Sequence, residues 1–195
     1  MRATPTVKII ISSMVGMIVI VAIIYGSLLP IARSRRFIAG LRALGSVQSL
    51  QQFQDTFDAS FKFYAPVGDE EIAKFLSNDI MSAISQQDTP ENVSRALLGY
   101  LEPYMFKNDV RHLLTTGQMY YILWRRFGKQ EDFGKAEDYY LKVLEIGPKL
   151  PPPLYTLFQL YKDGGQKEKA KVIAKRILSL WPDDEQTKST LEMLQ

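Results

Sequence analysis

The sequence contains no cysteine and only one histidine, His112. Without cysteine there are no disulfide bonds, thiolate zinc sites or cysteine nucleophiles. A single histidine does not make up a set of metal ligands, so His112 is expected at the surface or between helices. A phosphate-binding loop and a nucleophile elbow are also missing from the sequence. We therefore predict no catalytic residue, no metal and no cofactor, and a protein that is not an enzyme.

Acidic residues are absent from residues 1–36, which carry five basic side chains. Residues 37–195 hold 19 basic and 21 acidic groups, so the net charge of this part is −2. The positive charge of the whole chain therefore belongs to its N-terminal segment. Nucleic-acid-binding domains normally carry a basic patch on the domain itself. We accordingly expect no nucleic-acid partner.

Charge is also missing from Ile9 to Leu29, a run of 21 residues. A helix of this length would measure about 31 Å at roughly 1.5 Å per residue, which matches the hydrocarbon core of a bilayer. The flanking basic residues, which fix topology and lie where anionic head groups would be, are Lys8, Arg33, Arg35 and Arg36. We predict an uncleaved transmembrane helix over 9–29 after a short tail, 1–8. A cleaved signal peptide and a buried core helix are the alternatives.

Positive charges on the two sides of this predicted span differ by one. Arg2, Lys8 and the terminal amine precede it, and four arginines up to Arg42 follow it. The positive-inside rule thus favours a cytoplasmic C-terminal part. Gly16 is one of several residues in the run small enough for a second helix to approach closely, which leaves self-association open.

Strand patterns are absent after the apolar run, because apolar residues recur there at spacings of three and four, which are typical of helices. The predicted fold class is all-α. A basic juxtamembrane segment is expected over 30–45, followed by a helix that Ser46 caps. Thr89 is expected to cap a later helix, which Pro103 ends or kinks. The expected inner face of the helix between them consists of Ile72, Phe75, Leu76, Ile80 and Ile84.

The second half of the chain writes one helical phrase twice. Residues 135–148 read KAEDYYLKVLEIGP, and residues 169–182, 34 positions later, read KAKVIAKRILSLWP. The residues that correspond at this offset are Leu123 and Leu157, Phe127 and Tyr161, Ala136 and Ala170, and Pro148 and Pro182. This period and pattern resemble the tetratricopeptide repeat family, whose paired helices need a small residue where they cross.

The resemblance implies an α-helical solenoid with two repeats, 117–150 and 151–184. A short capping helix, with Leu191 and Leu194 buried, is expected over 185–195. Two repeats are few for a stable solenoid, so 46–116 are expected to form divergent helical pairs, or else a separate helical pad. Bulky Trp124 and Phe158 stand where the family usually has a small residue. The helices there are expected to lie farther apart, or the rings to point elsewhere.

Members of this family bind protein or peptide along a concave face lined by the first helix of each repeat. By position, the resemblance implies partner-binding roles for Tyr121, Arg125, Tyr155, Gln159 and Lys162. An exposed aromatic ring beside a long polar side chain suits a peptide or a partner helix. The two tyrosines could equally be half-buried between repeats. The leading hypothesis is a membrane-anchored scaffold or adaptor.

A second resemblance concerns the stretch YGSLLPIARSRRFIAGLRAL, followed after one glycine by SVQSLQQFQDTFDASFKFY. This arrangement is similar to the region that follows the last span of bacterial O-antigen ligase-like proteins. It implies a bacterial plasma membrane and a role as an accessory or C-terminal part of a cell-envelope glycan ligase or polymerase system. A self-associating structural membrane protein, present as a homo-oligomer, is the remaining alternative.

Overall fold

The structure, a computed structural model, describes residues 5–194 and forms two compact units, residues 1–73 and 74–195. The described residues form helices and connecting loops without a strand, which confirms the all-α prediction. The helices of the first unit are α1 (Pro5–Ile23), the π-helical turn η1 (Ile24–Leu28), α2 (Leu29–Ala43), the 3-10 turn η2 (Leu44–Ser46) and α3 (Leu50–Phe61). The helix α4 (Asp69–Ser85) begins in the first unit and ends in the second. The remaining elements are α5 (Glu91–Leu101), the 3-10 turn η3 (Glu102–Tyr104), α6 (Val110–Phe127), α7 (Gln130–Ile146), α8 (Pro151–Asp163), α9 (Lys167–Leu180) and α10 (Glu185–Met193).

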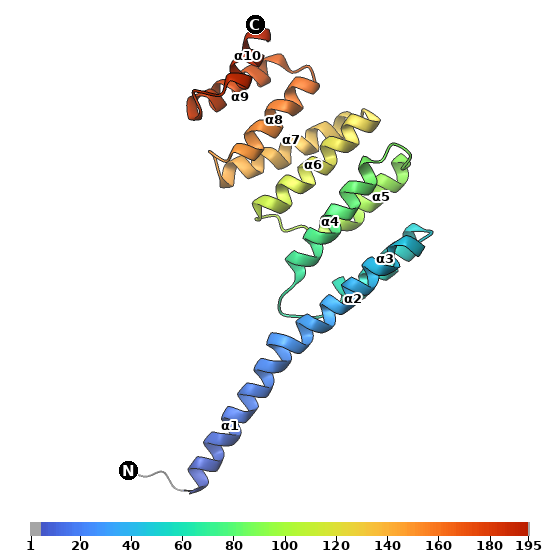
Figure 1. Cartoon of the computed structure of the whole chain (residues 1–195), viewed down its shortest axis with the longest axis vertical. Coiled ribbons are helices and arrows are strands. Elements are labelled where there is room, and N and C mark those ends of the chain that lie inside the picture. The colour runs from blue at the N-terminus through green and yellow to red at the C-terminus, as the bar shows by residue number, and fades with distance from the viewer. Residues whose placement is uncertain (1–4, 195) are drawn as a thin grey trace. The chain divides into compact units, whose positions relative to one another are not determined.

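One continuous helical stretch runs from Pro5 to Ser46 (Figure 1). The side chains of α1 are all exposed, and the stretch is long and apolar enough to cross a membrane. The predicted span, 9–29, covers most of α1, all of η1 and the first residue of α2. Part of the predicted tail, including Arg2, lies outside the described residues, and Lys8 is already helical.

The helix widens over η1, where the N–H of Leu29 donates to the carbonyl of Ile24, five residues earlier. Pro30 stands in the first turn of α2. It has no N–H, and in a regular α-helix its ring would meet the carbonyl four residues before it. A single π-helical turn moves that carbonyl away, so the helix continues past the proline without ending.

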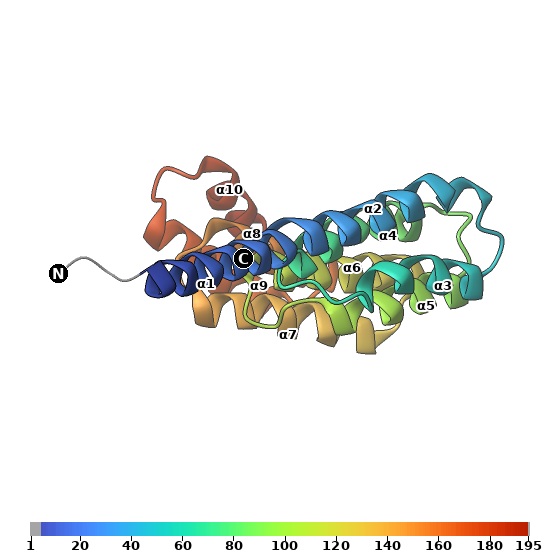
Figure 2. The ribbon, with the colours of Figure 1, turned by 90° about the horizontal axis from the view of Figure 1, so that it is seen from below.

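In the first unit α3 packs back along α2 (Figures 1 and 2). The core between them is aromatic: the ring of Phe57 lies 5.9 Å from that of Phe37 and 4.9 Å from that of Phe53. Gly40 lets the helices come this close, because a Cβ there would lie 3.3 Å from the Phe57 ring. The periodicity of the α3 sequence thus buries one face of a short helix against the extension of the apolar helix.

The predicted start of α3 was wrong. The helix begins at Leu50, and the hydroxyl of Ser49 accepts from the N–H of Gln52 at 3.2 Å. Ser46 instead donates to the carbonyl of Ala43 at 2.7 Å and closes η2. Both serines can cap a helix, and periodicity alone did not distinguish them.

In the second unit successive helices pack on one another: α7 on α6, α8 on α7, α9 on α8 and α10 on α9 (Figure 1). Asp109 begins α6 by accepting from the N–H groups of Arg111 and His112, as predicted for a cap at this position. Gly128 ends α6 in the left-handed conformation, with φ of 71°, where a side chain would be strained. The next helix can therefore turn back at once.

Positions that correspond in the two copies of the phrase share their environment for the most part. The buried members are Leu123, Ala136, Leu157, Tyr161 and Ala170. Pro148 and Pro182 are exposed in the loops after α7 and α9, and Phe127 is only half-buried at the end of α6. Leu191 and Leu194 of the last segment are half-buried rather than buried, and Gln195 lies outside the described residues.

The close approach of α6 and α7 occurs at a residue that the repeat pattern did not indicate. A Cβ on Gly117 would lie 2.7 Å from Cε1 of Tyr140, whose side chain is fully buried. The bulky ring of Trp124 is not at this crossing but meets Phe133 edge-on, with centroids 5.1 Å apart. Of the two expectations for Trp124, the ring pointing elsewhere is the one observed.

Arginine side chains join α4 and α5 to the repeated part of the second unit. Arg126 of α6 donates to the carbonyls of Ile84 and Thr89 at 2.5 and 2.7 Å. Thr89 does not cap α5 as predicted, because its hydroxyl donates to the carbonyl of Ala83 at 2.8 Å. The expected inner face of α4 was also wrong at one position, since Phe75 is 54% exposed.

Candidate functional site

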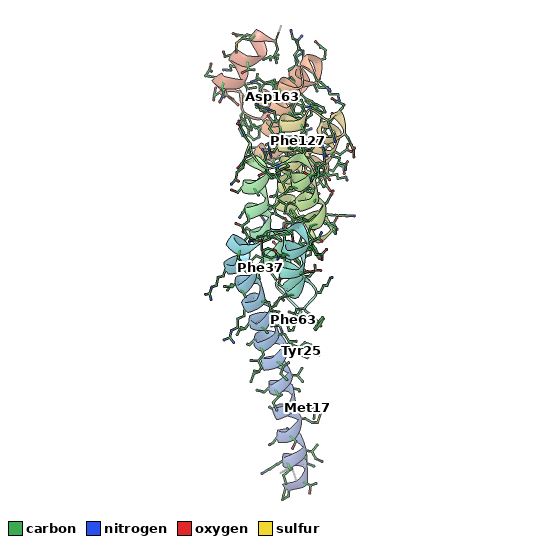
Figure 3. All side chains as sticks on the ribbon, turned by 90° about the vertical axis from the view of Figure 1, so that its right-hand side faces the viewer. Met17, Tyr25, Phe37, Phe63, Phe127 and Asp163 are labelled. Atoms are coloured by element: carbon green, nitrogen blue, oxygen red, sulfur yellow. The ribbon has the colours of Figure 1, made fainter. Side chains whose placement is uncertain are left out.

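Three of the five side chains expected to bind a partner converge on one carboxylate, Asp163 at the end of α8. Arg125 of α6 places Nη1 2.5 Å from Oδ2, and Gln159 places Nε2 2.7 Å from Oδ1. The hydroxyl of Tyr121 also donates to Oδ2. Asp163 lies near the top of the side-chain view (Figure 3). It thus links two helices through groups that the sequence assigned to one surface.

The electrostatics of this cluster favour fixed charges at neutral pH. Burial raises the pKa of the Tyr121 phenol, and the hydrogen bond to Asp163 raises it further. Its bond with Tyr121 and the charge of Asp163 raise the pKa of Arg125. Neither group is therefore poised to transfer a proton near neutral pH. The cluster is suited to hydrogen bonding and packing rather than acid–base catalysis.

Aromatic rings surround the cluster. The rings of Tyr121 and Trp124 stack with centroids 6.0 Å apart. An open cavity of about 440 Å³ lies beside them, lined by Trp124, Arg125, Gly128 and Asp163. The Arg125 side chain is 57% exposed and that of Asp163 is 20% exposed. The floor is therefore ordered by internal bonds, while the arginine is still in contact with solvent.

The same combination recurs 34 residues later in the first helix of the next copy. The hydroxyl of Tyr155 donates to Oδ2 of Asp184 at 2.6 Å, and its ring stacks on Trp181 with centroids 6.0 Å apart. This bond raises the pKa of Tyr155 to about 12 and lowers that of Asp184 below its ordinary value of 3.8. We call the surface formed by Tyr121, Arg125, Tyr155, Gln159, Asp163 and Asp184 the tyrosine–aspartate strip.

Lys162, the fifth expected partner-binding residue, has a different neighbour. Its Nζ lies 5.3 Å from the centroid of the Phe158 ring, a cation–π distance. Phe158 itself is buried. Lys162 is half-buried and lies one residue before Asp163, so it is not part of the strip as defined.

A second tyrosine–carboxylate cluster joins η3 to α6 and α7. Glu102 accepts from the hydroxyls of Tyr120 and Tyr139, each at 2.6 Å, and the two rings stack with centroids 5.9 Å apart. Burial, with the Glu102 bond second, raises the pKa of both phenols. Because Tyr120 is 5% exposed, this cluster serves packing between helices.

His112 also serves the fold. Its side chain is 2% exposed, and Nδ1 accepts from the N–H of Phe106 at 2.8 Å. This bond fixes the loop before α6 and leaves Nδ1 without a proton. The interpretation of His112 as a histidine between helices fits this environment better than a surface position.

Among the four basic residues assigned to topology and lipid contact, Arg33 differs from the others. Lys8, Arg35 and Arg36 are exposed, but Arg33 is only 2% exposed. Its Nε donates to the carbonyl of Ser60 at 3.1 Å, Nη2 donates to that of Phe61 at 3.4 Å, and the guanidinium pairs with Asp69. Arg33 therefore holds the end of α3, and its burial leaves it unable to contact head groups.

Comparison with known proteins adds no assignment. No protein-family model matches the chain, and no curated protein matches it significantly.

Proposed function

We propose that this chain is a single-pass membrane adaptor, in which residues 9–29 cross the bilayer and the tyrosine–aspartate strip binds a protein or peptide. The observation that carries the proposal is the paired occurrence of one surface arrangement at the repeat interval. Tyr121 and Tyr155 each donate to an aspartate and each stack on a tryptophan. The strip is attached to a chain that also carries an exposed apolar helix.

The proposal treats α6–α7 and α8–α9 as two tetratricopeptide-like hairpins, with α4–α5 as a divergent pair. It is supported by the burial of Ala136 and Ala170, both fully buried at corresponding positions. It is also supported by the bidentate pair between Arg95 of α5 and Asp132 of α7, with distances of 2.9 and 2.6 Å. A stack of this kind supplies each hairpin with neighbours on both sides.

The chemistry of the strip indicates the partner class. Stacked tyrosine and tryptophan rings offer rigid apolar area at a small entropy cost, and such rings dominate binding energies at protein interfaces. Arg125 is neutralised by Asp163 and remains partly exposed. An extended peptide or a helix with apolar side chains, and with a backbone or side-chain acceptor for Arg125, fits these features. The proposed location is the plasma membrane of a bacterium, with the strip on the cytoplasmic side by the charge argument.

Site-specific photo-crosslinking in membranes tests the proposal. A photoreactive residue in place of Gln159, in the strip, should give an adduct with a second protein. The same residue in place of Val172, which is 65% exposed on α9, should not. The double variant Tyr121→Ala/Tyr155→Ala should lower the adduct yield at least about tenfold, since losing one interface anchor costs about 2 kcal/mol or more.

The identity of the adduct separates the alternatives. A soluble or single-pass partner supports the adaptor. A polytopic glycan enzyme would instead make the chain an accessory of a cell-envelope system, and adducts only between copies of this chain would make it a self-associating structural protein. Equal adducts at positions 159 and 172 would contradict a role for the strip.

A further inference from the structure

The loop between α3 and α4, residues 62–68, carries side chains that a water-facing loop does not need. Its sequence is KFYAPVG. Tyr64 is 67% exposed and Val67 is 59% exposed, with exposed Pro66 between them. Ala65 is buried and holds the loop on the first unit. We call residues 62–68 the return loop.

The bonds of Arg33 fix the depth at which the return loop begins. Arg33 is the first charged residue after the apolar run, four positions beyond Leu29. Its side chain binds the carbonyls of Ser60 and Phe61, the last turn of α3. The end of α3 is therefore held at the level where the uncharged part of the long helix ends, and the return loop starts there.

From that level the loop runs along the apolar helix. The ring of Tyr64 meets the ring of Tyr25 edge-on, with centroids 6.4 Å apart and an angle of 77°. Tyr25 belongs to the uncharged run, eight residues before Arg33. Eight residues of helix correspond to about 12 Å along the axis. The exposed ring of Tyr64 thus lies beside the run that is predicted to cross the membrane.

Phe63 and Arg36 give the same position independently. The guanidinium of Arg36 lies 3.9 Å from the centroid of the Phe63 ring. Along the helix axis Phe63 lies between the levels of Phe37 and Tyr25 (Figure 3). Helical side chains tilt toward the N-terminus of their helix, which here is the direction of the apolar run. Arg36 and the loop aromatic therefore occupy the zone where head groups meet the hydrocarbon core.

From these contacts we infer that the return loop is a second membrane-contact element, with Phe63, Tyr64 and Val67 inserted into the interfacial layer of the bilayer. The inference rests on the proposed transmembrane role of residues 9–29. Lipid is the occupant because these side chains continue the exposed apolar surface of that helix at the same depth. Tyrosine is enriched at membrane interfaces, where its ring is apolar and its hydroxyl meets water. Exposed Arg35 and ring-stacked Arg36 lie beside anionic head groups.

The insertion also fixes how the first unit stands on the membrane. A single helix would leave the α2–α3 hairpin free to tilt about the span. A second contact through the return loop restricts this tilt, because Arg33 joins the loop to the helix at the membrane surface. The hairpin then acts as a rigid post for the residues that follow.

The chain has no cysteine, so single-cysteine variants labelled with an environment-sensitive fluorophore test the inference in full-length protein in lipid vesicles. Tyr64→Cys probes the return loop. Met17→Cys, 69% exposed on α1, probes the span, and Gln48→Cys, exposed after η2, is the water-side control. Vesicles contain phosphatidylglycerol and phosphatidylcholine, with or without a nitroxide-labelled lipid that quenches only probes in contact with lipid.

We expect blue-shifted emission and quenching by the nitroxide lipid at positions 17 and 64, and neither effect at position 48. Quenching at 17 with position 64 behaving like position 48 would overturn the inference and leave the span intact. Absence of quenching at 17 would overturn both the span and the inference. A quenched probe at 48 would also overturn it, because the hairpin would then lie flat on the membrane.

Discussion

The ion pair between Arg95 and Asp132 makes an asymmetric prediction. The Asp132 side chain is 1% exposed, whereas that of Arg95 is 29% exposed. Arg95 also pairs with Glu91 at 2.7 Å. Replacing Arg95 by methionine keeps the length of the side chain but leaves the Asp132 carboxylate buried without its cation. Replacing Asp132 by asparagine leaves an arginine that still reaches water and Glu91.

The magnitudes follow from this difference in burial. Removing one partner of a buried ion pair costs about 3–5 kcal/mol, so Arg95→Met should lower the free energy of unfolding by about 3 kcal/mol. The value lies at the low end because Asp132 stands in the first turn of α7, where the helix dipole favours a negative charge. Asp132→Asn should cost about 1–2 kcal/mol, as for the loss of a charged hydrogen bond. The apolar double variant Arg95→Met/Asp132→Leu should cost less than Arg95→Met alone.

Urea unfolding of the full-length chain in nanodiscs, followed by far-UV circular dichroism, measures these differences. Lys135→Met is the matched control, because Lys135 pairs with Glu131 at the surface, where both side chains are exposed. Surface pairs contribute about 0–1 kcal/mol. If Asp132→Asn cost as much as Arg95→Met, the argument from unequal burial would be refuted.

Three further predictions concern other contacts. Gly117→Ala places a Cβ 2.7 Å from the Tyr140 ring. Crowding of about 1–3 kcal/mol outweighs a gain of about 1 kcal/mol in helix propensity, so unfolding by urea should show a loss that Tyr140→Leu reverses in the double variant. Arg33→Met removes the side chain that holds the end of α3, so amide hydrogen exchange over residues 60–69 should accelerate, whereas exposed Arg35→Met should leave it unchanged. Asp184 has a folded-state pKa below 3.8, chiefly through the bond from Tyr155. Its contribution to stability is therefore present above the ordinary pKa and is lost as pH falls through the folded-state pKa. Tyr155→Phe should raise the Asp184 pKa toward 3.8 in an NMR titration, and an unchanged pKa would show that Tyr155 is not its cause.

Features that depend on short-range periodicity could be predicted from the sequence. The apolar run, the helical classes and the buried pairs such as Ala136 and Ala170 follow from spacings of one to four residues and from the interval of 34. Caps were predicted where one candidate stood alone, as at Asp109, and missed where two serines competed for α3.

The centre of the candidate site could not be predicted in the same way. Asp163 binds Tyr121 and Arg125 from 42 and 38 residues away, and no local pattern marks such a pair. Arg33 read as a flanking charge because its burial depends on α3 folding back over it. Gly117 is ordinary in the sequence and becomes a crossing point only because Tyr140 faces it. A tyrosine at the repeat interval, with an aspartate near the end of the next element, is the one signal that indicated the strip.

Alkaline carbonate extraction of membranes that contain the full-length chain tests the central claim most directly. The account predicts that the chain stays in the membrane pellet and is released only by detergent. The variant Ile18→Lys/Val19→Lys, with two charges at the middle of the apolar run, should be recovered in the supernatant, since each lysine at the centre of a span costs about 2.5–3.5 kcal/mol of insertion free energy. Recovery of the unaltered chain in the alkaline supernatant would contradict the account.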